Sequence, residues 1–144
     1  MSGPAWIDDR DVIVLHERLI GLYGGPGGLR DRGLLESALG RARQLRAYDE
    51  RADIIDLAAA CTAGIVLNHP FVDGNKRTGF LVGVLFLELN GFRFTADEAA
   101  ATRAVIELAA GTLDAKGYAA FLRANATRQS KPGSETGFAS ETCL

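Results

Sequence analysis

The sequence has few of the residues that build disulfide-stapled, zinc-binding or membrane-spanning proteins. Its 144 residues include two cysteines, two histidines, one methionine and one tryptophan. Cys61 lies in an apolar stretch and Cys143 is the penultimate residue, so the two offer no disulfide framework. Histidine and cysteine are too few and too far apart for a zinc site. The longest apolar runs, such as residues 80–87, fall well short of the roughly 20 residues that a membrane-spanning helix needs.

An excess of positive charge is also missing. The chain has 16 Lys and Arg against 18 Asp and Glu, a formal net charge of −2. We therefore expect no direct nucleic-acid binding, because such binding depends on neutralising phosphates. The first residues lack the basic and apolar regions of a secretory signal, so we expect a cytoplasmic protein without a membrane partner. The length and the hydrophobic fraction of 47% correspond to one globular domain.

The spacing of apolar residues predicts an all-α domain with about six helices. Apolar residues recur at intervals of three and four, and Asp, Gly, Asn and Pro mark where segments begin and end. The expected helices cover Asp8–Tyr23, a segment starting at the N-cap Asp31 and ending in the Arg-rich residues 41–46, Asp53–Asn68, residues 75–89, a segment to Ala110 after a capping box at Thr95-Ala96-Asp97-Glu98, and Leu113–Asn125. No sheet is predicted, although residues 92–94 form a short extended piece.

Two of these helices are apolar on nearly every side, which indicates that they lie at the centre of a helical bundle. They are the segments 53–68 and 75–89, and a polar loop joins them. His69-Pro70 ends the first helix, because the residue before a proline is pushed out of the α region. We assign residues 1–126 to the domain and 127–144 to a polar, disordered C-terminal tail.

The connecting loop contains several residues that are suited to catalysis or to binding a ligand. Gly74 permits close backbone approach, and the free N–H groups of the next helix form an anion site. Lys76 and Arg77 add positive charge at a helix N-terminus, which is unfavourable unless an anion such as phosphate binds there. Asp73 beside a phosphate suits a Mg²⁺ ligand. His69 is able to accept a proton from an attacking hydroxyl at neutral pH.

The segment His69-Pro70-Phe71-Val72-Asp73-Gly74-Asn75-Lys76-Arg77 resembles the signature of the Fic/Doc superfamily, His-x-Phe-x-(Asp/Glu/Asn)-Gly-Asn-(Gly/Lys)-Arg. The lysine followed by Thr78 is similar to the Doc (death on curing) branch of toxin–antitoxin toxins. The similarity extends through Leu29-Arg30-Asp31, residues 33–38 and residues 86–91, and covers most of residues 6–125.

This resemblance implies a Fic-fold helical bundle whose active-site loop joins the two central helices. For the Doc branch it implies a kinase that moves the γ-phosphate of ATP onto a threonine of elongation factor Tu and arrests translation. His69 would then be the general base and Asp73 the Mg²⁺ ligand. Nucleotide binding would fall to Gly74, Asn75, Lys76 and Arg77, with Lys76 and Arg77 also acting in catalysis.

Two other functions stay open at the level of sequence. Related enzymes that transfer AMP carry Gly at the position of Lys76 and Arg at that of Phe80, and both departures disfavour AMP transfer. A catalytically idle module that only pairs with an antitoxin is the second alternative. No Glu is followed by Gly or Asn, so the family's self-inhibitory motif is absent and a separate antitoxin would supply the inhibitory helix.

Two remaining features are interpreted as structural. His16 falls beside the apolar stripe of the first predicted helix and is interpreted as a packed residue rather than a ligand. Residues 24–28, Gly-Gly-Pro-Gly-Gly, follow no strand and lack a Gly-Lys-(Ser/Thr) ending. They are therefore interpreted as a flexible loop rather than a phosphate-binding loop.

Overall fold

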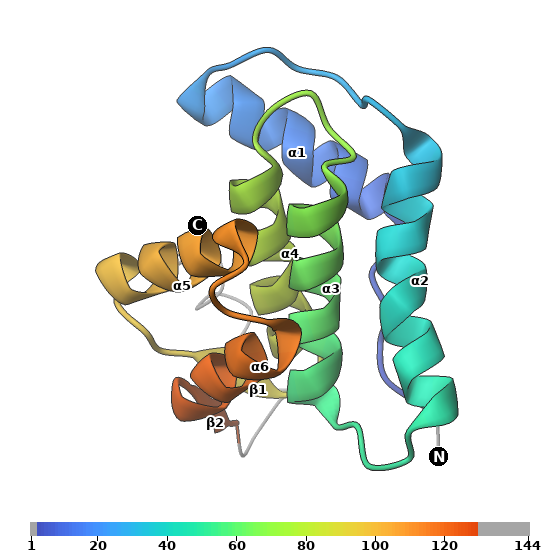
Figure 1. Cartoon of the computed structure of the whole chain (residues 1–144), viewed down its shortest axis with the longest axis vertical. Coiled ribbons are helices and arrows are strands. Elements are labelled where there is room, and N and C mark those ends of the chain that lie inside the picture. The colour runs from blue at the N-terminus through green and yellow to red at the C-terminus, as the bar shows by residue number, and fades with distance from the viewer. Residues whose placement is uncertain (1–2, 130–144) are drawn as a thin grey trace.

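A computed structural model describes residues 3–129 and confirms the all-α prediction (Figure 1). The helices are α1 (Asp9–Tyr23), α2 (Arg32–Tyr48), α3 (Ile54–Asn68), α4 (Asn75–Leu89), α5 (Glu98–Ala110) and α6 (Ala115–Ala124). Two short strands, β1 (Phe92–Phe94) and β2 (Ala126–Arg128), complete the described part.

Aspartate side chains begin most of the helices. Asp8, Asp31 and Asp53 each accept a hydrogen bond from a backbone N–H three residues later, at the start of α1, α2 and α3. Such caps satisfy N–H groups that have no partner within the helix. The capping box predicted at Thr95 is wrong, because Asp97 caps α5 and the Thr95 hydroxyl instead donates to the carbonyl of Asn125.

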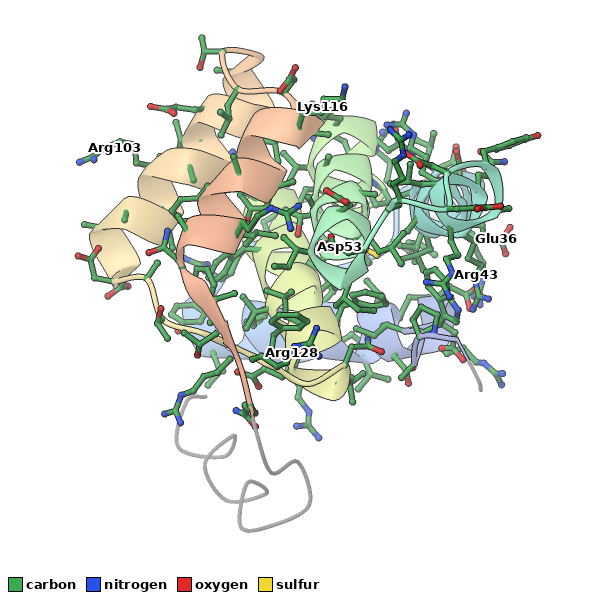
Figure 2. The ribbon with its side chains drawn as sticks, turned by 90° about the horizontal axis from the view of Figure 1, so that it is seen from below. Glu36, Arg43, Asp53, Arg103, Lys116 and Arg128 are labelled. Atoms are coloured by element: carbon green, nitrogen blue, oxygen red, sulfur yellow. The ribbon has the colours of Figure 1, made fainter. Side chains whose placement is uncertain are left out.

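Helix α3 lies at the centre of the bundle, as its uniformly apolar sequence predicted. It runs between α2 on one side and α4 on the other (Figure 1). Figure 2 shows α3 end-on, with Asp53 at its start. Glu36 and Arg43 of α2 lie to the right of Asp53, Arg103 of α5 lies to the left, and Lys116 of α6 lies above it. Its side chains Leu57, Ile65 and Val66 are fully buried. Burial raises the pKa of the Cys61 thiol, also on α3, to about 12, so this thiol stays protonated and unreactive at neutral pH.

Close contact between α2 and α3 depends on Gly64. A Cβ placed there would lie 2.8 Å from the carbonyl oxygen of Ala38 and 2.9 Å from its Cα. These are backbone atoms of a buried helix, so they have little freedom to move aside.

We predict that Gly64→Ala lowers the free energy of unfolding by about 1–3 kcal/mol, because the added methyl overpacks the helix pair. Gly40→Ala on α2 is the matched control, since nothing lies within 4 Å of a Cβ there. It should stabilise the protein by about 0.5–1 kcal/mol through helix propensity. Urea denaturation of both variants measures the difference, and equal effects would contradict this account of the packing.

A small antiparallel sheet, which the sequence did not predict, joins the end of the domain to its middle. Phe92, Arg93 and Phe94 pair with Arg128, Thr127 and Ala126 respectively. The extended piece 92–94 is thus a strand. Thr127 and Arg128, which the sequence places in the tail, belong to its partner strand. Residues 130–144 of the predicted tail lie outside the described residues.

One end of the bundle brings together three segments that are distant in sequence. The loop between α3 and α4 lies beside α1, and the glycine-rich connection from α1 to α2 passes close to both (Figure 1). Leu29 of that connection forms an antiparallel bridge with Phe71 of the loop. Within residues 3–129, no helix has the length and apolar character needed to cross a membrane.

Candidate active site

The loop between α3 and α4 borders a hollow of about 370 Å³. Its lining contains all six residues that the sequence analysis selected, namely His69, Asp73, Gly74, Asn75, Lys76 and Arg77, together with Val72. The structure therefore brings a base, a carboxylate, two cations and a helix N-terminus around one space.

His69 ends α3 in an unusual backbone conformation. Its φ of 52° and ψ of 57° lie in the left-handed region, and it is the one non-glycine residue with positive φ in the described part of the chain. The guanidinium of Arg30 donates to the carbonyls of His69 (2.8 Å) and Asn68 (3.1 Å). These carbonyls end a helix and lack helical partners, so a cation there is favourable. His69 is an exposed residue and forms part of the lining of the hollow.

Phe71 and Asn75 hold the loop against the domain. Phe71 is 1% exposed and anchors the loop in the hydrophobic core. The Asn75 side chain accepts from the backbone N–H of Phe71 (2.9 Å) and donates to its carbonyl (3.0 Å). The amide oxygen and one of the two amide N–H groups thus brace the loop. The backbone N–H of Asn75 lies in the first turn of α4, where N–H groups can bind an anion.

Asp73 presents a carboxylate to solvent with one oxygen already oriented. Its Oδ1 accepts from the N–H of Gly74 at 2.8 Å. Its Oδ2 lies next to Gly25, where a Cβ would come within 2.7 Å. The absence of a side chain at Gly25 thus leaves room around Oδ2.

This arrangement fits a magnesium ion. Within the described residues there is no group of three or more His, Cys, Asp or Glu side chains that could hold a metal by themselves. Mg²⁺ does not need such a group, because one carboxylate, water and substrate phosphates are enough. Asp73, with space around Oδ2, would supply the one carboxylate.

The N-terminus of α4 is open toward the hollow. Its N-cap is Gly74, with a left-handed φ of 78°, and no side chain caps the first turn. The N–H groups there are free to meet an anion, and the exposed Lys76 and Arg77 add positive charge. The guanidinium of Arg77 lies over the ring of Tyr23, 4.0 Å from its centroid, in a cation–π contact.

Sequence reasoning missed three residues that contact this site, namely Arg30, Tyr23 and Gly25. It also interpreted His16 as structural; the ring is indeed 1% exposed, but its Nε2 hydrogen-bonds to the carbonyl of Asp73. One signal could have indicated this contact. A histidine on the buried face of an amphipathic helix needs a hydrogen-bond partner. The partners of the other three depend on tertiary contacts alone.

A second hollow of about 540 Å³ lies on α5 and is lined by Glu98, Ala99, Thr102, Arg103 and Ile106. All five residues come from one helix. Since no other element contributes groups to it, this hollow lacks the converging polar side chains of a reaction site.

The sequence is similar to proteins of one known family. The model of the family described as Fic/DOC matches residues 6–87. The protein named Protein kinase doc, from Escherichia phage P1, is 36% identical over 85 residues, which cover 59% of this chain and 68% of that protein. Toxin Doc of Mycolicibacterium smegmatis is 38% identical over 76 residues, covering 52% of this chain and 58% of that protein. The segment that the family model matches, residues 6–87, includes all residues of the site.

Proposed function

The chain belongs to the Fic/DOC family, and on this premise we propose that it is a Doc-type toxin that transfers the γ-phosphate of ATP to a threonine of elongation factor Tu. Phosphorylation of this translation factor would arrest protein synthesis in the cytoplasm. The relatives named Protein kinase doc and Toxin Doc support the coarser part of this proposal. The choice of elongation factor Tu rests on the family resemblance.

The observation that carries the proposal is the convergence of three chemical groups on one hollow. His69 supplies a base, Asp73 a carboxylate for Mg²⁺, and the N-terminus of α4 a set of phosphate donors. Transfer of a phosphoryl group requires little more than positioning and charge stabilisation.

In the proposed reaction His69 accepts the proton of the target hydroxyl as the hydroxyl oxygen bonds to the γ-phosphorus and the bond to ADP breaks. The backbone N–H groups of α4, with Lys76 and Arg77, bind the phosphate oxygens. Bound Mg²⁺, held by Asp73, would neutralise charge on the phosphates. The bracing of the loop by Asn75 keeps these groups at fixed separations.

Transfer of AMP is the alternative reaction. The position at which related AMP-transferring enzymes carry a second Arg is Phe80 here. Phe80 is partly buried against the core, and its ring packs edge-on against Phe94 with centroids 5.6 Å apart. An aromatic ring in this setting provides no phosphate clamp, which favours phosphoryl transfer.

Intact mass spectrometry of elongation factor Tu, incubated with the protein, ATP and Mg²⁺, tests the proposal. We expect the mass of one phosphate to be added. Addition of the mass of AMP to elongation factor Tu would instead show that the protein transfers AMP. No change in mass would contradict elongation factor Tu as the target.

We also propose that a cognate antitoxin protein inhibits the enzyme by supplying a helix. The naming of both relatives as Doc proteins supports a toxin–antitoxin pair. Co-expression of a cognate antitoxin should restore growth to cells that express this chain. Continued growth arrest when such a protein is bound to this chain would contradict the proposed inhibition.

We predict that Gly25→Ala raises the Mg²⁺ concentration needed for half-maximal activity by about 10-fold, an effect of the size seen when outer-shell partners of metal sites change. The reason is that the new methyl would displace Oδ2 of Asp73. Enzyme rates measured against Mg²⁺ concentration give the shift.

Gly24→Ala is the matched control for this prediction. Gly24 also has a positive φ, 87°, so alanine is strained at both positions, but nothing lies within 4 Å of a Cβ at Gly24. Gly24→Ala should lower the melting temperature and leave the Mg²⁺ requirement unchanged. An equal Mg²⁺ shift in both variants would mean that loop strain, rather than contact with Asp73, is responsible.

A further inference from the structure

His16 is a buried polar residue whose one polar contact reaches the candidate site. It lies on the inward face of α1 with 1% of its surface exposed. Its Nε2 is 2.8 Å from the backbone carbonyl oxygen of Asp73. Because a carbonyl oxygen only accepts hydrogen bonds, Nε2 must carry the hydrogen. The tautomer or charge state of His16 is thereby limited to forms protonated at Nε2.

The ring of His16 also lies against the loop on either side of Asp73, at Phe71 and Gly74. It stacks on Phe71, with centroids 3.8 Å apart and the planes 9° from parallel. A Cβ at Gly74 would lie 3.5 Å from Nε2, so the loop backbone passes directly over the imidazole edge. Among the hydrogen bonds of residues 3–129, that from His16 is the one that reaches the Asp73 carbonyl.

Because the peptide bond is planar, the hydrogen bond from His16 also affects the orientation of the Asp73 carboxylate. The carbonyl of Asp73 and the N–H of Gly74 belong to the same rigid plane and point in opposite directions. The N–H of Gly74 donates in turn to Oδ1 of Asp73 at 2.8 Å. Holding the carbonyl therefore sets the direction of the N–H, which sets the carboxylate and leaves Oδ2 beside Gly25.

We propose that His16 is a positioning residue that orients the carboxylate of Asp73 through the Asp73–Gly74 peptide. This inference rests on the proposed function, in which Asp73 binds Mg²⁺ together with the nucleotide. In this role His16 acts through the peptide and not by contact with the nucleotide or the metal. Its role joins helix α1 to the reaction site across 57 positions of sequence.

Two substitutions separate the hydrogen bond from the packing. His16→Phe keeps a flat ring against Phe71 and removes the donor, whereas His16→Gln removes the ring and keeps an N–H donor of similar reach. Val12→Ala is the packing control, because Val12 is a fully buried residue of α1 outside the site.

The first readout is the carbonyl ¹³C chemical shift of Asp73 in the metal-free protein, which needs no enzyme activity. The second is calorimetric binding of a non-hydrolysable ATP analogue as a function of Mg²⁺ concentration. For His16→Phe we expect a changed carbonyl shift and a Mg²⁺ requirement raised about 10-fold. His16→Gln should lie closer to the wild type in both, and Val12→Ala should lower only the melting temperature.

The result that would overturn the proposal is a His16→Phe variant with the carbonyl shift and Mg²⁺ requirement of the wild type, because His16 would then serve packing alone. Equal changes in His16→Phe and Val12→Ala would overturn it as well. Failure of the wild type to bind the analogue with Mg²⁺ would count against the proposed function, while the carbonyl shift of the metal-free variants would still decide whether His16 holds the Asp73 peptide.

Discussion

Replacement of His69 by alanine is expected to lower the rate of phosphoryl transfer by about 10²–10⁴-fold, the usual loss when a positioned general base is removed. The variant should also lose its toxicity when expressed in growing cells. Transfer of ³²P from γ-labelled ATP to elongation factor Tu measures the first effect, and colony counts after induction measure the second.

The fold should survive this change, because His69 is exposed and its side chain contributes nothing to the core. Its left-handed backbone is the one structural concern. His69→Asn addresses it, since asparagine tolerates this conformation better than alanine and is a poor proton acceptor. Both variants should melt close to the wild type and be inactive. A His69→Ala protein that still arrested growth would favour the idle module that acts by binding alone.

Replacement of Asp73 by asparagine is expected to lower activity by on the order of 10²–10³-fold, because in the proposed reaction the metal held by Asp73 would supply several kcal/mol of charge stabilisation. Asparagine keeps the oxygen that accepts from the N–H of Gly74 and loses only the charge. The variant should therefore retain the loop geometry. Rates measured over a wide range of Mg²⁺ concentrations test this.

Asp73→Ala removes both the charge and the oxygen and serves as the comparison. If the charge is what matters, the two variants should be equally inactive, and high Mg²⁺ should restore neither. Activity in Asp73→Asn close to the wild type would show that the residue acts through the turn and would contradict its proposed role as a Mg²⁺ ligand.

Much of the helical structure could be predicted because it depends on neighbouring residues. The cap Asp31 lies where the sequence predicted it, since capping involves groups three positions apart. Helices α1 and α3 begin directly after Asp8 and Asp53, the residues at which the sequence predicted their starts. The central place of α3 was also predictable, because a helix without a polar face has to be buried on all sides.

The two wrong predictions of secondary structure have a common cause, because both depend on contacts between residues far apart in the sequence. The start of α5 was misplaced because Thr95 is engaged by Asn125, 30 positions away. The pairing of β1 with β2 likewise joins segments more than 30 positions apart and left Thr127 and Arg128 assigned to the tail. Short strands of three residues carry too little periodicity to be recognised in isolation.

The sequence by itself determined the identity and order of the reactive groups. From His69 to Arg77 they lie within nine positions at the junction of two helices, so local backbone geometry alone brings them near one another. The tertiary structure decided how these groups are held. Arg30 reaches the end of α3, Gly25 makes room beside Asp73, and His16 bonds to the Asp73 carbonyl. These partners lie about 40 to 57 positions away from the residues they contact, and only the packing of α1 and the glycine-rich connection against the loop makes them neighbours.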